Sequence, residues 1–284
     1  MRAHCGAMTS HTHIHPLDDA LLLQPTAPGV FTGRTTEPYW NMVGPYGGVT
    51  AATLLQGVLQ HRGRLGDPLS LTVNYAGAVT EGAFTVRAQA VRTNRSTQHW
   101  WVTLSQADAE GVEQVATTAT VITAVRRGTW SSTETPMPTV QKPADYPAID
   151  GLFPVQWVRR YEMRPIAGPL PAQWDGAEHD SLTRLWVRDT PARALDFAAL
   201  AGISDVFFPR IWRRRATRVP IGTVSMTVYF HAGAELLAHT GGGYLLAQAR
   251  AQEFRNGFFD QTAQLWNEAG EMLVTTQQIV YYKE

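Results

Sequence analysis

The chain has 284 residues, of which 44% are hydrophobic and 17% charged, and its 24 basic and 24 acidic residues cancel to a net charge of zero. This composition excludes intrinsic disorder and allows one large domain or two domains of about 140 residues each. A nucleic-acid-binding protein usually carries a basic excess or a basic stripe, so the balance predicts no nucleic-acid partner. The dense basic cluster 210–218 is interpreted as a solvated helix end, with an anionic ligand as the alternative.

The single cysteine excludes an internal disulfide and a cysteine-based metal site. No run reaches the roughly 18 apolar residues that a membrane helix needs, and the N-terminus has no apolar signal core. We therefore expect a cytoplasmic protein without a membrane partner. Four N-terminal histidines (His4, His11, His13 and His15) could bind a metal as a local tract, but residues 1–28 are interpreted as a flexible tail that binds none.

The first half of the chain predicts a strand, a helix and then four strands. Residues 29–36 are typical of a short strand, and GPYGG at 44–48 is a turn that opens into a helix over roughly 48–61. Glycines at a helix start let a ligand or another chain approach the free N–H groups closely. Segments rich in Val, Thr and aromatic residues then predict strands over residues 69–76, 83–93, 99–108 and 112–125.

A proline-rich segment precedes a second half with the same order of elements. It predicts a linker over residues 129–154, between an N-terminal domain at 29–128 and a C-terminal domain at 155–284. Thr190-Pro191 predicts the N-cap and first-turn proline of a helix over residues 192–208. Strand-like segments lie at 155–163 and 182–188 before this helix, and at 222–232, 244–254, 258–267 and 272–282 after it.

The two halves also match residue by residue. SLTVNY at 70–75 resembles SMTVYF at 225–230, and an offset of 159 positions pairs Thr117 with Thr276 together with several further identities. Such matches in the same predicted elements indicate an internal duplication, with shared strand composition as the alternative. Each unit then has a curved antiparallel sheet that packs on the small-residue face of a central helix.

The predicted helix over residues 192–208 carries a carboxylate, Asp205, on the face that presents its smallest residues. Burying an unpaired carboxylate costs several kcal/mol. Asp205 therefore has either a strong partner, such as Arg210 or Arg213, or a functional role. The first-half helix at 48–61 has no acidic residue, which favours one active site per chain, in the second half.

These features resemble the acyl-CoA thioesterase II family, in which two hotdog domains follow each other in one chain. The resemblance covers about 29–282 and rests on GPYGG at 44–48, the helix end at Asp205, TVSMTVYFH at 223–231 and VTTQQ at 274–278. It implies an α+β tandem hotdog, each unit a long central helix wrapped by a curved antiparallel β-sheet. It also implies an acyl-CoA substrate, no cofactor and a homo-oligomer.

In that family an Asp on the second helix, a Thr on the next strand and a Gln on the last strand hold the hydrolytic water. The matching residues are Asp205, Thr223 and Gln278, so the resemblance implies that these three are catalytic. Neighbours on a strand point to opposite faces, so only one of Gln277 and Gln278 can face the helix. Thr227 and Ser225 share the face of Thr223 in a regular strand, so either could replace it.

The residues themselves fit direct attack by water on a thioester. The chain has no G-x-S-x-G elbow, and its one cysteine lies in the tail, so no covalent nucleophile is predicted. Burial of Asp205 would raise its pKa and make it a better base near neutral pH. The backbone N–H groups of Gly47 and Gly48 could polarise the thioester carbonyl, and Arg213 is a candidate contact for the phosphates of CoA.

Two other functions stay open beside hydrolysis of a fatty acyl-CoA to the free acid and CoA. A hotdog hydratase or dehydratase acting on enoyl thioesters pairs an Asp or Glu with a His, and the nearest histidine after Asp205 is His231. A non-catalytic acyl-CoA-binding module would bind the thioester without turnover.

Overall fold

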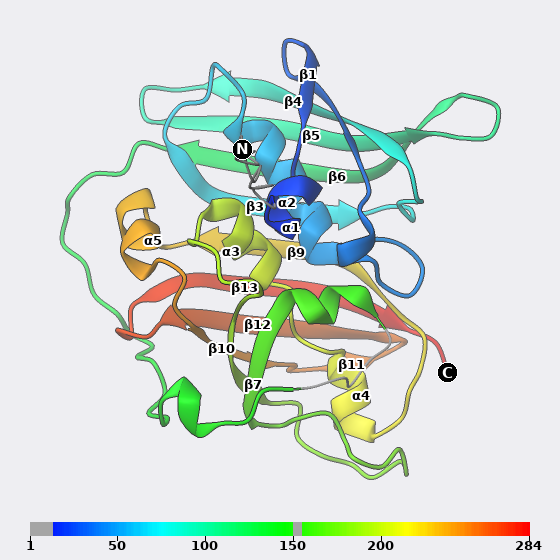
Figure 1. The fold of residues 1–284 in the computed structure, drawn as a ribbon, viewed down its shortest axis with the longest axis vertical. Helices are drawn as coiled ribbons and strands as arrows, with labels where there is room; N and C mark the ends of the chain where they lie inside the picture. Colours follow the sequence, from blue (N-terminus) through cyan, green and yellow to red (C-terminus); the bar gives the residue numbers. More distant parts are fainter. Residues whose placement is uncertain (1–13, 150–154) are drawn as a thin grey trace, which may run out of the picture.

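The computed structural model describes residues 14–149 and 155–284. One antiparallel sheet of 13 strands curves around two central helices, α2 (Gly47–Leu59) and α3 (Phe197–Ile203), which pack against each other on its inner face (Figure 1). The strands are β1 (Gln24–Ala27), β2 (Val30–Arg34), β3 (Asp67–Tyr75), β4 (Ala83–Thr93), β5 (Thr97–Ala107), β6 (Glu113–Ala124), β7 (Tyr161–Ala167), β8 (Thr183–Asp189), β9 (Ile221–Phe230), β10 (Leu245–Arg250), β11 (Phe254–Arg255), β12 (Phe258–Asn267) and β13 (Met272–Tyr282). The shorter helices are α1 (Pro16–Ala20), α4 (Arg210–Arg215) and α5 (Ala234–Thr240), with 3-10 turns η1 (Glu37–Tyr39), η2 (Pro143–Asp145) and η3 (Gln156–Arg160).

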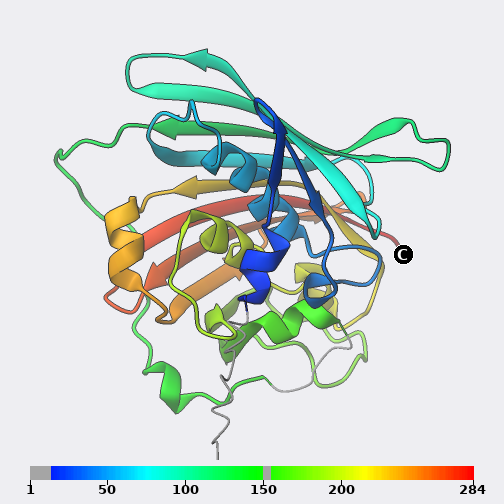
Figure 2. The ribbon, with the colours of Figure 1, turned by 45° about the horizontal axis from the view of Figure 1, so that its top comes forward.

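The strand order is symmetric about the middle of the sheet. It runs β2-β4-β5-β6-β3 through the first half and continues β9-β13-β12-β10-β8 through the second. The halves meet where β3 pairs with β9, and there Thr72 and Thr227, which are equivalent in the repeated segments, are direct partners with their Oγ1 atoms 3.0 Å apart. An approximate two-fold axis therefore passes between these threonines. This confirms the predicted α+β class with two helix-and-sheet units (Figure 2).

The start of α2 is held tightly against the end of α3. A Cβ atom on Gly48 would lie 2.4 Å from the carbonyl oxygen of Gly202, so only glycine allows the two backbones to approach this closely. The hydroxyl of Tyr46 donates a hydrogen bond of 2.9 Å to the same carbonyl. Helix α2 is buried on nearly all sides, as expected for a central helix whose stability comes from packing.

The second central helix differs from its prediction at both ends. Its N-cap is Asp196, whose carboxylate accepts a hydrogen bond of 2.8 Å from the backbone N–H of Ala199. The predicted cap and first-turn proline at Thr190-Pro191 are therefore wrong, because the chain stays irregular until Asp196 satisfies a free N–H group of the first turn. The helix ends at Ile203, so Asp205 lies in the turn that follows it.

Residues 14–28 are not the flexible tail that the sequence predicts. Leu17 and Leu21 are buried in the core, and β1 pairs with β2 at the edge of the sheet. His15 caps α1, since its Nδ1 atom accepts a hydrogen bond from the backbone N–H of Leu17. The other three N-terminal histidines lie outside the described residues.

The connection between the halves packs on the outer face of the sheet. Within residues 129–149 the only regular element is the short turn η2. Two buried tryptophans on the outer face of the second half, Trp186 and Trp266, donate hydrogen bonds to the carbonyls of Gln141 and Thr135 at 3.0 and 3.4 Å. The linker thereby shields this part of the outer face from solvent.

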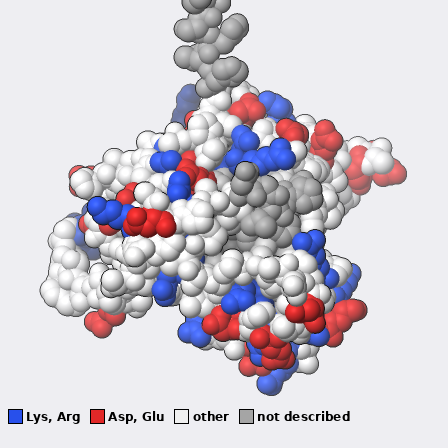
Figure 3. Space-filling model, turned by 60° about the horizontal axis from the view of Figure 1, so that its bottom comes forward, with Lys and Arg blue, Asp and Glu red and all other residues white. Residues whose placement is uncertain are grey.

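The surface carries charges of both signs close together. On the face seen in Figure 3, blue and red side chains are interspersed, and no broad area of a single sign is visible. In the described part of the chain, no helix is long and apolar enough to cross a membrane.

Candidate active site

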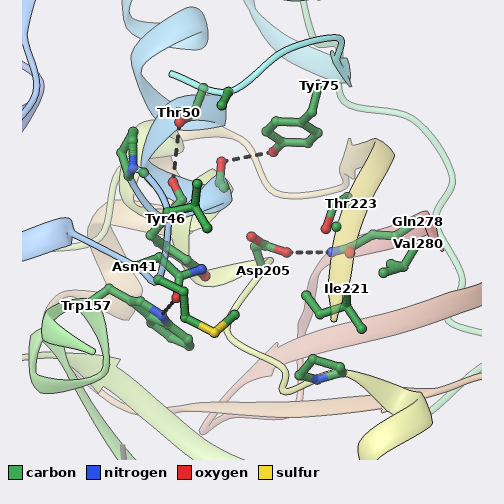
Figure 4. Close-up of a pocket in the computed structure, with 18 of the residues that line it drawn as sticks. Asn41, Tyr46, Thr50, Tyr75, Trp157, Asp205, Ile221, Thr223, Gln278 and Val280 are labelled. Atoms are coloured by element: carbon green, nitrogen blue, oxygen red, sulfur yellow. Dashed lines mark hydrogen bonds between the residues drawn. The ribbon is translucent and has the colours of Figure 1, made fainter. Parts of the chain in front are cut away.

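A cavity of about 280 Å³ opens where the start of α2 and the turn after α3 meet the sheet (Figure 4). Both halves of the chain line it. Inward-facing side chains of β12 and β13, two strands of the second half, form its floor. The lining residues are 41–47, Thr50, Tyr75, 77–79 and Thr117 from the first half, and Val155, Trp157, Asp205, 207–209, Trp212, 221–223, Phe259, Gln261, Gln278 and Val280 from the second.

Asp205 faces this cavity from the turn after α3. Its Oδ1 atom accepts a hydrogen bond of 2.8 Å from Nε2 of Gln278, and its carboxylate also bonds the backbone N–H of Gly48. Burial raises the pKa of Asp205 to about 7, although these two hydrogen bonds act in the opposite direction. A carboxyl group with this pKa exchanges a proton readily near neutral pH, which suits a general base.

The glutamine beside Asp205 is Gln278. Its side chain is buried on the inner face of β13, whereas Gln277 points outward and is exposed. The Nε2 atom of Gln278 also lies 3.3 Å from the sulfur of Met226 on the neighbouring strand β9. The structure thus decides which of the two glutamines contacts Asp205.

Thr223 lines the cavity, and Thr227 does not. The pairing of β9 with β13 has a bulge, since Ile279 is opposite Ser225 but Val280 is opposite Thr223. The extra residue reverses the alternation of side chains, so Thr223 points inward while Thr227 bonds Thr72 on the outer side. The alternative that Thr227 replaces Thr223 is therefore wrong. Figure 4 shows Thr223 beside Gln278, with Asp205 facing both.

Of the two glycines at the start of α2, only Gly47 keeps its N–H group available for a substrate. The N–H group of Gly48 is used by Asp205, so its predicted contact with the thioester carbonyl is not supported. Gly47 is close to Asp205 as well, because a Cβ atom there would lie 2.8 Å from Oδ2 of Asp205. The N-cap of α2 is Tyr46, whose side chain makes no capping bond, so the helix start is open.

Within the described residues, Asp205 bonds neither Arg210 nor Arg213, the two arginines that the sequence analysis considers as its partners. Arg210 is buried, but its guanidinium donates to backbone carbonyls and to a threonine hydroxyl. Arg213 lies 3.6 Å from Asp180 and does not line the cavity, so its predicted contact with CoA is not supported either. The charge of Asp205 is therefore stabilised by hydrogen bonds alone.

Three aromatic residues at the site escape the sequence analysis. Tyr75 donates a hydrogen bond of 2.9 Å to the carbonyl of Gly47, and burial and the charge of Asp205 raise the pKa of its phenol well above the usual value. Tyr46 stacks on Trp157 with ring centroids 4.3 Å apart. Tyr46 belongs to the GPYGG turn and could have been noticed, whereas nothing in the sequence links Trp157 to that turn.

The first half has no copy of the Asp205–Gln278 pair. The two-fold relation of the strands places Val121 of β6 where Gln278 stands in β13, because Thr72 pairs with Thr120 as Thr227 pairs with Gln277. Val121 pairs with Leu71 on β3, as Gln278 pairs with Met226 on β9. The predicted second acid–base residue, His231, hydrogen-bonds Thr275 at 3.0 Å and does not line the cavity. No cluster of three metal-ligating side chains occurs within residues 14–149 and 155–284.

Comparisons with known proteins cover nearly the whole chain. Residues 36–124 match the N-terminal domain of acyl-CoA thioesterases, and residues 135–282 match the C-terminal domain. A search of curated protein sequences finds no relative.

Solved structures give the same architecture. A conserved protein of unknown function with a hot dog fold from Alicyclobacillus acidocaldarius is 44% identical, with a TM-score of 0.89 over 95% of this chain and 99% of that one. The tesB protein of Mycobacterium avium subsp. paratuberculosis is 17% identical, with a TM-score of 0.73 over 94% of this chain and 98% of that one. The acyl-CoA thioesterase II TesB2 of Mycobacterium marinum is 15% identical, with a TM-score of 0.69 and the same coverage. The fold is therefore a double hotdog.

Proposed function

The chain belongs to the acyl-CoA thioesterase family and is a thioester hydrolase, and from this premise we propose that it hydrolyses a fatty acyl-CoA to the free acid and CoA at the cavity around Asp205. One observation carries the proposal. Asp205 faces a cavity built by both halves, with a pKa raised to about 7 and a buried amide, that of Gln278, bonded to its carboxylate.

In the proposed reaction, ionised Asp205 accepts a proton from a water molecule that the side chains of Gln278 and Thr223 orient. The water oxygen attacks the carbonyl carbon of the thioester, and the N–H group of Gly47 stabilises the resulting oxyanion. The C–S bond then breaks, and the CoA thiolate takes the proton from Asp205. The carboxylate is thereby restored for the next turnover.

The test is CoA release from acyl-CoA substrates of two to eighteen carbons. We expect hydrolysis of some members, and a loss of about 10²–10⁴-fold in kcat for Asp205→Ala with the fold retained. No hydrolysis of any member, or full activity of Asp205→Ala, would contradict the proposal.

The two alternative functions receive less support. A hydratase or dehydratase needs a second acid–base group, but His231 lies outside the cavity. Hydration of crotonyl-CoA, seen as loss of its conjugated absorbance, is the control that would favour it. A non-catalytic module does not agree with membership in a family of hydrolases.

We also infer that the chain self-associates through the outer face of the sheet. One row of outward residues, in register across six strands, consists of Trp101, Thr120, Thr72, Thr227, Gln277 and Thr262, and none is charged. Trp101 and, in the next row, Tyr229 are 42% and 51% exposed. The approximate two-fold axis runs through this face, so a second copy of the chain can meet it with the same surface.

A further inference from the structure

The floor of the cavity contains a second inward-facing glutamine, which the proposed reaction does not use. Gln261 lies on β12 directly opposite Gln278 of β13, and both line the cavity. Gln261 is only 3% exposed, and its carboxamide makes no hydrogen bond to any described residue. In the neighbouring amide, by contrast, Nε2 of Gln278 bonds Asp205 and lies 3.3 Å from the sulfur of Met226.

An amide that lines a cavity without a protein partner bonds to whatever fills the cavity, because a polar group left unpaired away from water is costly. Such groups are usually paired in the state in which a protein works. Since Gln261 lines the cavity, its amide is available to hydrogen-bond a polar atom of a substrate that enters there.

The surroundings of Gln261 indicate which part of the substrate it meets. On the same face of the sheet lie Phe259 and Val280, and Trp212 and Ile221 close the same end of the cavity. This apolar end suits an acyl chain better than the polar pantetheine arm of CoA. Met42 and Val43, which also line the cavity, are 57% and 79% exposed, so the cavity opens to solvent there and offers an entry for the arm.

The spacing of the strands limits how far along the acyl chain Gln261 can reach. Adjacent strands lie about 4.8 Å apart, so Gln261 stands about one strand spacing from Gln278, the residue that bonds Asp205. A substrate atom one strand spacing away from the reacting carbonyl belongs to the first carbons of the acyl chain or to a substituent on them.

On these grounds, and resting on the proposed thioesterase function, we infer that Gln261 is a specificity-determining residue that hydrogen-bonds a hydroxyl or keto oxygen near the thioester. The preferred substrates are then hydroxyacyl- or oxoacyl-CoA thioesters, and an unsubstituted chain leaves the amide unpaired. Sites built to bond a substrate hydroxyl discriminate strongly against analogues that lack it.

The experiment compares kcat/KM for 3-hydroxybutyryl-CoA and butyryl-CoA in the natural chain, in Gln261→Met and in Gln277→Met. Methionine preserves the size of glutamine and removes its hydrogen bonds, and Gln277 is the exposed neighbour that serves as the matched control. We expect the natural chain to prefer the hydroxylated substrate by at least tenfold. Gln261→Met should lower that ratio at least tenfold, mostly through the hydroxylated substrate, while Gln277→Met leaves it unchanged.

An unchanged ratio in Gln261→Met, or an equal fall for both substrates, overturns the inference while leaving the thioesterase function intact. An equal fall would mean that the amide contacts the thioester or the pantetheine arm, which all substrates share. Absence of hydrolysis of both substrates by the natural chain would instead overturn the proposed function. If Gln261→Met does not fold, Gln261→Asn withdraws the amide by one methylene group and must lower the same ratio.

Discussion

The Nε2 atom of Gln278 donates a hydrogen bond of 2.8 Å to Oδ1 of Asp205, and this bond joins the last strand of the sheet to the turn after α3. It stabilises the ionised form of Asp205, whereas burial favours the protonated form and raises the pKa of Asp205 to about 7. The balance between these two effects sets the pH at which a base is available in the cavity.

The first prediction concerns the pH dependence of hydrolysis. If ionised Asp205 is the base, kcat/KM rises with pH and levels off above about 7. Gln278→Met removes a hydrogen bond to the ionised carboxylate, so the inflection should move to higher pH and kcat should fall about 10²–10³-fold. The measurement is the pH profile of CoA release. Gln277→Met is the control, and a profile that stays unchanged in Gln278→Met would rule out this coupling.

The second prediction concerns the stability of the fold. The pKa of Asp205 is higher in the folded chain than in the unfolded chain, so the stability that it contributes is fully present below about pH 4 and is lost as pH rises through 7. Asp205→Asn should therefore raise the free energy of unfolding at pH 8. The increase is at most about 2–4 kcal/mol, because solvent in the cavity screens the charge. Denaturant unfolding at pH 5 and pH 8 measures it.

Asp189 provides the matched comparison for this effect. Burial likewise raises its pKa to about 7, and its Oδ1 atom has no hydrogen-bond partner among the described residues, yet Asp189 does not line the cavity. Asp189→Asn should change the pH dependence of unfolding in the same direction and leave the pH profile of kcat/KM unchanged. A shifted kinetic profile in Asp189→Asn would show that Asp205 is not the group that the kinetics report.

The third prediction separates the two glycines at the start of α2. A Cβ atom on Gly47 meets Oδ2 of Asp205 at 2.8 Å and the hydroxyl of Tyr75 at 3.4 Å, which are side-chain atoms that can shift. A Cβ atom on Gly48 meets the backbone oxygen of Gly202 at 2.4 Å, which cannot move without separating the helices. Gly47→Ala should therefore displace the carboxylate and lower kcat at least tenfold with little change in stability, since alanine also favours the helix by up to about 1 kcal/mol.

Gly48→Ala should instead destabilise the fold by about 1–3 kcal/mol, as overpacking in a close contact does. Thermal unfolding and CoA release, measured on both variants, distinguish the two effects. Equal loss of stability in the two variants would contradict the assigned contacts.

The sequence was sufficient to predict the duplicated architecture because the repeat, the strand composition and the glycine turn are all local patterns. It also brought Asp205 and Gln278 into one proposed site, although alternation along β13 could not decide between Gln277 and Gln278. The inward position of Thr223 depends on the bulge opposite Ile279 and Val280, and the residue pattern of the strand does not predict this bulge. Gln261 could not be found, because its role depends on which strands of the second half lie side by side under the cavity.

The last prediction concerns self-association. Trp101 lies in the uncharged row of the outer face and Tyr229 in the next row, so Trp101→Lys and Tyr229→Lys, combined in one variant, place two like charges in the proposed contact between copies. We expect this variant to have half or less of the molar mass of the natural chain in light scattering after size-exclusion chromatography. Trp130→Lys is the control, because Trp130 is 86% exposed but belongs to the linker rather than to this face. The proposed contact would be contradicted if the natural chain is monomeric, or if the variant has the same molar mass as the natural chain. The outer face would then be exposed to solvent.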